Sequence, residues 1–266
     1  MKERINFENR EAAEFIEDTP EMRASFKVSI FGTGSEKSVH DSVAVSIASE
    51  LAKKVIRDGQ HKIVTGGYED GVMGAASRSA REEAESLGRN DLLPEGVTLG
   101  DKLGNQSQES VITEKETLPE RLKDLIDEAS AVVVLHGKIG TVVELLTTLW
   151  SSAIEKIKKQ EDKKFIPKPL IIADSSLEHT DLVAFLRRRD SKIENAIKDV
   201  YFVSLSNHEG NRDIADAVNT INRIIENYYK MKLGRDISND DKQLLDKLSL
   251  GKFLESQQNF ESGSGI

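Results

Sequence analysis

The order of the elements expected from the sequence predicts an α/β protein with a Rossmann-like, three-layer, doubly wound fold and a mainly parallel sheet. Short apolar runs of strand length alternate with amphipathic helical patterns from residue 27 to residue 231. Strands and helices that alternate in this way pair as a parallel sheet with helices on both faces. Three of the strands also run directly into glycine turns, at the sheet edge where such folds bind their ligands.

The strands are predicted from apolar runs of four or five residues, at 27–31, 61–65, 96–100, 110–113, 131–135, 170–173 and 200–204. The helices are predicted where apolar residues recur every three or four positions. Their ranges are 40–57, 72–86, a helix that begins at Pro119, 140–159, 179–189 and 211–231. Proline is tolerated at the start of a helix, and Gly59 is expected to end the first one.

One large domain with two appendages accounts for the length of 266 residues. Residues 1–25 read as a polar helical lead-in, residues 26–232 as the Rossmann-like nucleotide-binding domain, and residues 233–266 as a charged C-terminal tail. A short helix is expected in this tail at about 239–248. The sequence shows no internal repeat and no domain linker before about residue 232.

Composition and charge exclude several classes of protein. The formal net charge of -9 argues against a nucleic-acid groove. Cysteine is absent, which excludes disulfides and thiolate metal sites. No stretch approaches the roughly 20 apolar residues of a membrane span, and the charged N-terminus lacks the core of a signal peptide. We therefore expect a cytoplasmic protein without membrane or nucleic-acid partners. No metal site is expected either, because His40, His61, His179 and His208 have no metal-like spacing.

The stretch 131–144 is the most informative part of the chain. An apolar strand is followed by a turn with Gly137 and Gly140, and then by a helix that opens with the hydroxyl of Thr141. The first N–H groups of such a helix point at a phosphate. Glu144 lies three residues after Thr141, so both should face the same side of the first turn. A carboxylate beside a phosphate cradle suits a sugar hydroxyl or a proton, which suggests chemistry as well as binding.

Two other strands end in glycine turns, at 32–35 and 66–71. One such turn is ordinary turn chemistry, since glycine is the usual residue of tight turns. Three of them at one edge of a sheet favour nucleotide or phosphoester binding.

The second turn carries a resemblance to a known family. Gly66-Gly67-Tyr68-Glu69-Asp70-Gly71-Val72-Met73-Gly74 resembles the Gly-Gly-Gly-x-x-Gly-x-Met-Gly signature of the Lonely Guy family, the lysine-decarboxylase-like Rossmann-fold nucleotide-binding proteins. Residues 136–144 are similar to the family's Pro-Gly-Gly-x-Gly-Thr-x-x-Glu, and residues 118–121 resemble its Met-x-x-Arg. Arg121 and His136 are fifteen positions apart, which is also the family's spacing. The resemblance is to a divergent member of this family and covers about residues 26–230.

The resemblance implies a set of site residues. Arg121 and Glu144 would be catalytic: Glu144 would bind ribose hydroxyls and favour an oxocarbenium-like transition state, and Arg121 would orient the substrate or Glu144. The residues that would bind substrate lie in the three turns and are Gly32, Thr33, Gly34, Gly66, Gly67, Tyr68, Gly71, Met73, His136, Gly137, Lys138, Ile139, Gly140 and Thr141.

Several of these residues have a structural alternative. Glu144 also fits as an ordinary first-turn acid, Arg121 as a surface arginine and Thr141 as a helix N-cap. Met73 fits better as a packing residue than as a recognition residue. His136 fits as a general acid for the leaving base or as a packed polar group. The ring of Tyr68 stacks on a base or fills space, and Lys138 adds charge to the phosphate site or points into water.

The leading hypothesis is a nucleoside 5′-monophosphate phosphoribohydrolase without a cofactor, which releases a free base and ribose 5-phosphate. The resemblance also implies a homodimer with its sites near the subunit interface. The alternative is a non-catalytic protein that binds or senses a nucleotide or cofactor, favoured by the departures from the motifs at Tyr68, Leu122, His136 and Lys138. A lysine decarboxylase is disfavoured, because no context for pyridoxal phosphate is visible.

Overall fold

Seven parallel strands form the single sheet of the molecule within the residues that the structure describes. This computed structural model describes residues 17–34, 37–100, 104–159, 165–174, 178–189, 197–205 and 211–255. The strand order is β4-β3-β2-β1-β5-β6-β7, and each neighbouring pair is parallel. The strands are β1 Lys27–Phe31, β2 Lys62–Thr65, β3 Glu95–Thr98, β4 Val111–Glu114, β5 Ala131–Leu135, β6 Leu170–Asp174 and β7 Val200–Ser204. The predicted α/β fold with a parallel sheet is therefore confirmed.

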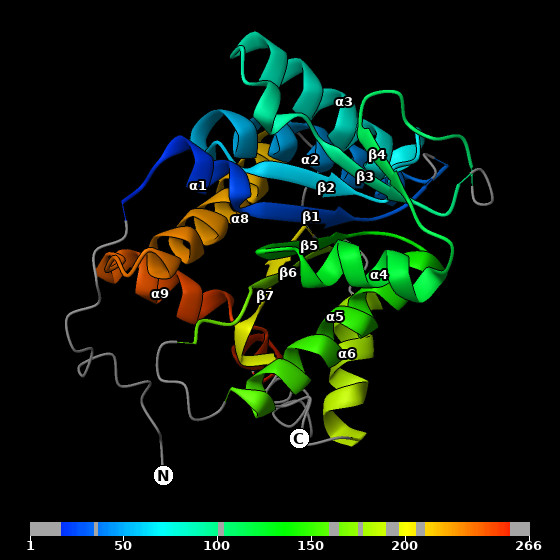
Figure 1. Ribbon diagram of the computed structural model, residues 1–266. Coiled ribbons are helices and arrows are strands. Elements are labelled where there is room, and N and C mark those ends of the chain that lie inside the picture. The colour runs from blue at the N-terminus through cyan, green and yellow to red at the C-terminus, as the bar shows by residue number, and fades with distance from the viewer. Residues whose placement is uncertain are drawn as a thin grey trace.

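Helices cover both faces of this sheet (Figure 1). They are α1 Pro20–Ser25, α2 Val39–Lys54, α3 Gly71–Ser86, α4 Leu118–Asp127, α5 Ile139–Lys158, α6 Glu178–Arg189, α8 Asn211–Lys232 and α9 Asn239–Leu248. The central strand β5 shows how the layers are held together. Val133 packs in the core with α2, α3 and α8, whereas its neighbours Val132 and Val134 pack in the core with α4, α5 and α6. Successive side chains of a strand point to opposite faces, so an unbroken apolar run supplies both cores.

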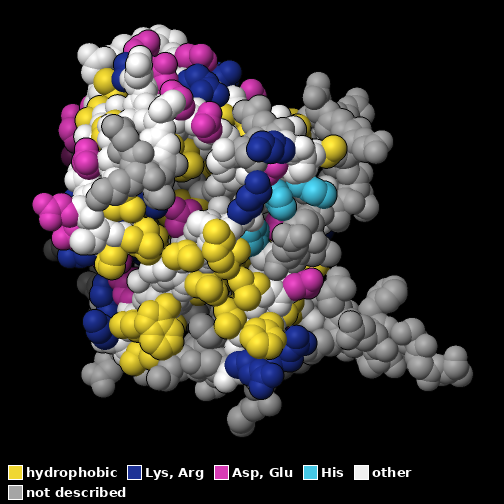
Figure 2. All heavy atoms as spheres, turned by 90° about the vertical axis from the view of Figure 1, so that its right-hand side faces the viewer, with side chains coloured by type: hydrophobic (Ala, Val, Ile, Leu, Met, Phe, Trp, Pro, Cys, Tyr) yellow, Lys and Arg dark blue, Asp and Glu magenta, His cyan; other side chains and the backbone are white. Residues whose placement is uncertain are grey.

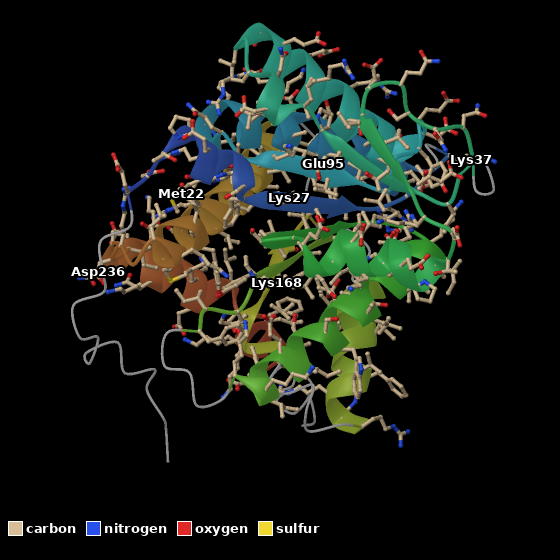
Figure 3. All side chains as sticks on the ribbon, viewed as in Figure 1. Met22, Lys27, Lys37, Glu95, Lys168 and Asp236 are labelled. Carbon is tan, nitrogen blue, oxygen red and sulfur yellow. The ribbon has the colours of Figure 1, made fainter. Side chains whose placement is uncertain are left out.

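The strand order reverses between β1 and β5. The chain runs outward from β1 through β2 and β3 to β4, and then returns to place β5 on the other side of β1. In open parallel sheets the crevice outside the carboxyl ends of the strands at such a reversal is the usual ligand site. At the opposite, amino-terminal edge, the amine of Lys27 lies 2.7 Å from the carboxylate of Glu95 (Figure 3).

The observed elements differ from the predicted ones mainly at their ends. The first predicted helix ends at Lys54 and continues as a π-helical turn over Val55–Gly59, and Gln60 rather than Gly59 takes the left-handed conformation, with φ 55. The helix predicted from Pro119 begins one residue earlier. Thr117 caps this helix together with the side chain of Glu120, in a capping box that the prediction missed.

The two appendages are described only in part. Residues 1–16 of the predicted helical lead-in lie outside the described residues, and α1 is the helix that remains of it. In the tail, α9 forms over the predicted range of 239–248. Beyond it, Leu250 and Leu254 are buried in the core on the α5 side of the sheet, so this part of the tail packs on the domain.

No helix among the described residues has both the length and the apolar character that crossing a bilayer requires. The cytoplasmic location stays a prediction.

Candidate functional site

The backbone of Thr33 joins the three glycine turns into one unit. Its N–H donates to the carbonyl oxygen of His136 at 2.8 Å, and its own carbonyl oxygen accepts from the N–H of Val72 at 2.9 Å. The turn after β1 is therefore tied to the turn after β5 and to the start of α3, which follows β2. Ser35, the last residue of the first predicted turn, lies outside the described residues.

A buried ion pair lies beside these turns. Nη1 of Arg121 on α4 is 3.3 Å from Oε1 of Glu144 on α5, and the two residues are 5% and 8% exposed. Nε of Arg121 also donates to the carbonyl oxygen of Val97 at 2.9 Å, which fixes the plane of the guanidinium group. Burial raises the pKa of the Glu144 carboxyl to about 7, although the charge and hydrogen bond of Arg121 act in the opposite direction. This carboxyl can therefore hold or release a proton near neutral pH.

Gly66 makes room for this arrangement at the end of β2. A side chain at this position would collide with the guanidinium group of Arg121 and with the sulfur of Met73. The terminal methyl group of Met73 also lies close to Gly34 in the first turn. Met73 thus fills the space between two glycine turns, which supports its role as a packing residue.

Tyr68 stands where the resembling family has its third glycine. Its ring is buried, its hydroxyl accepts a hydrogen bond from the N–H of Leu99 at 3.0 Å, and the guanidinium carbon of Arg121 lies 5.9 Å from the ring centre. These contacts hold the ring within the protein. The structure therefore supports the space-filling alternative for Tyr68 over stacking on a base.

The start of α5 differs from the prediction in one respect. Lys138, and not Thr141, is the N-cap residue, and its exposed side chain makes no capping hydrogen bond to the helix. Thr141 is the third residue of the helix and is buried against Gly137. The N–H groups of Ile139 and Gly140 belong to the first turn, where no helical carbonyl can accept from them. They are the groups that an anion would meet.

A second polar group of residues, which we call the histidine group, surrounds the side chain of His136. It consists of His40, Asp41, His136, Asp174 and His179. Nδ1 of His136 lies 3.5 Å from Oδ1 of Asp174, and Nε2 lies 4.0 Å from Oδ1 of Asp41. The other carboxylate oxygen of Asp174 lies 3.0 Å from Nδ1 of His179. The rings of His40 and His136 are 5.4 Å apart between centres.

The sequence interpretation missed most of the histidine group. It singled out only His136 and treated His40 and His179 as unrelated, because these residues come from separate segments. Asp174 did carry a usable signal. It is an acidic residue at the carboxyl end of an otherwise apolar strand, where parallel sheets place their functional groups. The described residues contain no group of three or more histidine or acidic side chains arranged to hold a metal ion.

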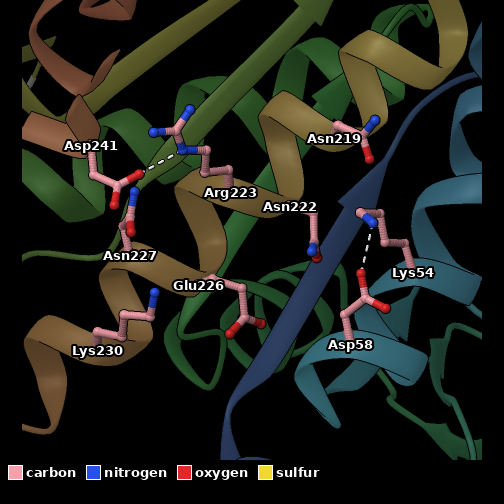
Figure 4. Close-up of a pocket in the computed structure, with 9 residues that line it drawn as sticks. All are labelled: Lys54, Asp58, Asn219, Asn222, Arg223, Glu226, Asn227, Lys230 and Asp241. Carbon is pink, nitrogen blue, oxygen red and sulfur yellow. Dashed lines mark hydrogen bonds and ion pairs between the residues drawn. The ribbon is translucent and has the colours of Figure 1, made fainter. Parts of the chain in front are cut away.

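The two main hollows described on the surface lie away from the turns. One has a volume of about 410 Å³ and lies between α2, α8 and α9, where Lys54 reaches Asp58 and Arg223 reaches Asp241 (Figure 4). The other, of about 900 Å³, lies between α2, α3 and α8 and includes Arg78. Ion pairs already engage Lys54, Asp58, Arg223 and Asp241 in the first hollow. The turns combine helix N–H groups with titratable side chains, so they are the candidate site.

A parallel sheet with joined glycine turns at its reversal point defines a protein of the Rossmann-like nucleotide- or cofactor-binding class. Residues 25–156 match the model of the SLOG cluster4 family. The SLOG superfamily includes the Lonely Guy-like Rossmann proteins. The predicted relationship is thus confirmed at the level of the superfamily. No curated protein matches the chain.

Solved structures with a similar fold share little sequence with this chain. The molybdenum cofactor binding protein of Rippkaea orientalis is 18% identical, with a TM-score of 0.47, over 74% of this chain and 96% of that one. The molybdenum cofactor carrier protein of Chlamydomonas reinhardtii is 15% identical, with a TM-score of 0.48, over 76% and 98%. DNA processing protein A of Helicobacter pylori is 18% identical, with a TM-score of 0.42, over 77% and 83%. Likenesses of this size say nothing about what this chain binds.

Proposed function

We propose that the protein is a nucleoside 5′-monophosphate phosphoribohydrolase, which cleaves the N-glycosidic bond to give a free base and ribose 5-phosphate. The observation that carries this proposal is the buried Arg121–Glu144 pair beside the first turn of α5. A carboxyl group with a pKa of about 7, next to free helix N–H groups, combines a proton-active group with an anion site.

Each group has a distinct role in the proposed reaction. The N–H groups at the start of α5 hold the 5′-phosphate. The C1′–N bond breaks, the oxygen of a water molecule bonds to C1′, and a proton from that water passes to the departing base. Ionised Glu144 stabilises the positive charge that develops on the ribose ring, and Arg121 positions this carboxylate. The proposed reaction needs no cofactor.

The test is to incubate the purified protein with nucleoside 5′-monophosphates and to measure the released base by chromatography. Glu144→Gln is expected to lower kcat/KM about 100-fold, because it removes one charge that stabilises the transition state. Glu155→Gln is the matched control, since Glu155 lies further along the same helix and pairs only with Lys159 among the contacts described. Activity of the wild type should rise with pH through about 7, as Glu144 ionises. Bound nucleotide without any release of base would reject the hydrolase.

A second candidate is a protein of the same superfamily that binds a nucleotide or cofactor without turnover. The observation that favours it is Tyr68, whose buried ring occupies the place of a glycine next to Arg121. Calorimetry with mononucleotides, ADP-ribose and cyclic nucleotides separates the two candidates. If the protein binds a nucleotide without turnover, and Glu144→Gln leaves that affinity unchanged, the non-catalytic candidate is supported. Release of base contradicts this candidate.

We also propose that the protein forms a homodimer through α5. Ile139, Trp150 and Ile157 are at least half exposed and lie on one face of this helix, and Leu118 of α4 and Phe185 of α6 are also exposed apolar side chains. Figure 2 shows apolar side chains gathered next to the histidines on the side toward which the strands point. An exposed apolar surface of this kind marks an interaction site. Trp150→Glu should convert a dimer to a monomer in light scattering, and a monomeric wild type would refute the proposal.

A further inference from the structure

The imidazole ring of His136 is held between two buried carboxylates. Nδ1 faces Asp174 at the end of β6, and Nε2 faces Asp41 in the first turn of α2. Asp174 is fully buried and Asp41 nearly so. A neutral imidazole has one N–H donor, whereas the imidazolium ion has two. The positions of the two acids therefore suit the protonated ring.

The rest of the histidine group adds to this effect. His179 at the start of α6 faces the same carboxylate of Asp174, and the ring centres of His136 and His179 are 6.4 Å apart. His40 on α2 lies on the exposed side of His136. Three histidines and two aspartates carry a formal charge of -2 when the histidines are neutral and +1 when all are protonated. Histidine is the side chain that changes charge between pH 5 and 8.

This change of charge occurs at the proposed phosphate site. His136 directly precedes Gly137, and its carbonyl oxygen accepts the hydrogen bond from Thr33 that joins the turns. Its side chain is 15% exposed, so the ring reaches the edge of the crevice. Lys138, the next cation along the turn, is exposed.

We propose that the histidine group makes anion binding at the 137–141 turn proton-coupled, so that a phosphoryl group binds tightly only with His136 protonated. With neutral histidines, Asp41 and Asp174 repel a dianion. With His136 charged, the same carboxylates stabilise the imidazolium that attracts it. Binding of the anion therefore takes up a proton. This inference rests on the phosphate site of the proposed function, but it is independent of catalysis.

The experiment is isothermal titration calorimetry between pH 5.5 and 8.5 with inorganic sulfate and with ribose 5-phosphate. Sulfate is needed because it stays doubly charged, whereas a phosphate ester itself takes up a proton near pH 6. Affinity for sulfate should fall about tenfold or more as pH rises across this range, because one positive charge near the anion is lost. Repeating the titration in buffers with different enthalpies of ionisation measures proton uptake, and neutral ribose is the uncharged control.

Two variants are expected to change the affinity for sulfate in opposite directions. His136→Gln should reduce sulfate affinity at pH 5.5 and abolish most of the pH dependence. Asp174→Asn should increase sulfate affinity at pH 8.5, because it removes a repelling charge. A purely structural role for these residues would lower affinity in both variants at every pH. Circular dichroism and thermal melting at both pH values verify that each variant is folded.

The outcomes separate this inference from the proposed function. Sulfate binding with the same affinity at every pH and without proton uptake overturns the coupling and leaves the phosphate site standing. Failure of sulfate and ribose 5-phosphate to bind at any pH overturns both. Coupled binding by a protein that releases no base rejects the hydrolase and retains the coupling.

Discussion

The Arg121–Glu144 pair and the histidine group lie at the same edge of the sheet, but they hold charge in different ways. The pair combines one cation with one acid, and both are buried between α4 and α5. The histidine group brings five titratable side chains together from α2, β5, β6 and α6, and its central ring reaches the surface. Removal of one partner from the pair leaves the other buried without its hydrogen-bond partner. A change of protonation in the histidine group instead alters the charge that a ligand meets.

This difference shows how burial changes the consequences of ionising a side chain. Glu144 is taken out of water, so its ionisation becomes linked to the stability of the fold. His136 keeps contact with water, and the proposed coupling links its charge to anions at the crevice. Three substitutions test this division.

The largest effect is expected for Arg121→Met. It leaves Glu144 and the carbonyl oxygen of Val97 buried without the hydrogen bonds of the guanidinium group, and the free energy of unfolding should fall by about 3 kcal/mol. Urea denaturation at pH 7 measures this loss. Arg57→Met is the control, because Arg57 makes a two-point ion pair with Glu83 on the exposed surface, and its loss should have a far smaller effect. Similar losses of unfolding free energy in Arg121→Met and Arg57→Met would contradict the view that burial makes the Arg121–Glu144 pair more important for stability than a surface pair.

The next effect is the pH dependence of stability that Glu144 causes. Its pKa is raised from 4.5 to about 7 by folding, so the native state binds this proton more tightly than the unfolded state. This contribution to stability is complete below pH 4.5 and is lost as pH rises through 7, with a total of about 3 kcal/mol. Glu144→Gln removes it. The difference in stability between the variant and the wild type should therefore move in favour of the variant from pH 5 to pH 8.

Denaturation of both proteins at several pH values measures this difference. Glu155→Gln, with its partly exposed carboxyl on the same helix, should parallel the wild type. A pH-independent difference between Glu144→Gln and the wild type would show that Glu144 titrates as it does in the unfolded chain.

The smallest effect is expected for Lys138→Gln, which alters the turn between the two regions. Lys138 is exposed and makes no capping hydrogen bond to α5, so stability should change by no more than about 0.5 kcal/mol. Affinity for sulfate should decrease by a similar factor at every pH, because the variant removes one positive charge and leaves the histidine group intact. A loss of the pH dependence itself would assign the coupling to Lys138 and not to His136.

The fold was predictable because its signals are local. Apolar runs such as 131–135 and helical periodicity such as that of 211–231 reflect neighbours along the chain, and the structure has a strand and a helix there. The ends of elements were less predictable. Gln60 in the left-handed conformation and the capping box of Thr117 depend on single side chains and backbone angles that an apolar pattern does not contain.

The candidate site was predictable only in part. Arg121 and Glu144 were singled out by resemblance to a family motif, and the structure brings them to 3.3 Å. Their catalytic role stays a prediction. Asp41, Asp174 and His179 were not found, because they belong to no common motif and meet only when β1, which precedes α2, and β6 pair with β5 from either side.

The sequence by itself determined the alternation of strands and helices, the three glycine turns and the motif that includes Glu144, because each is encoded by residues close together in the chain. Tertiary structure decided that the chain returns to place β5 against β1, which joins the turns through Thr33 and surrounds His136 with two buried acids. It also decided the pKa of Glu144, since burial between helices sets the cost of its charge. These properties depend on distances between residues that are remote in sequence.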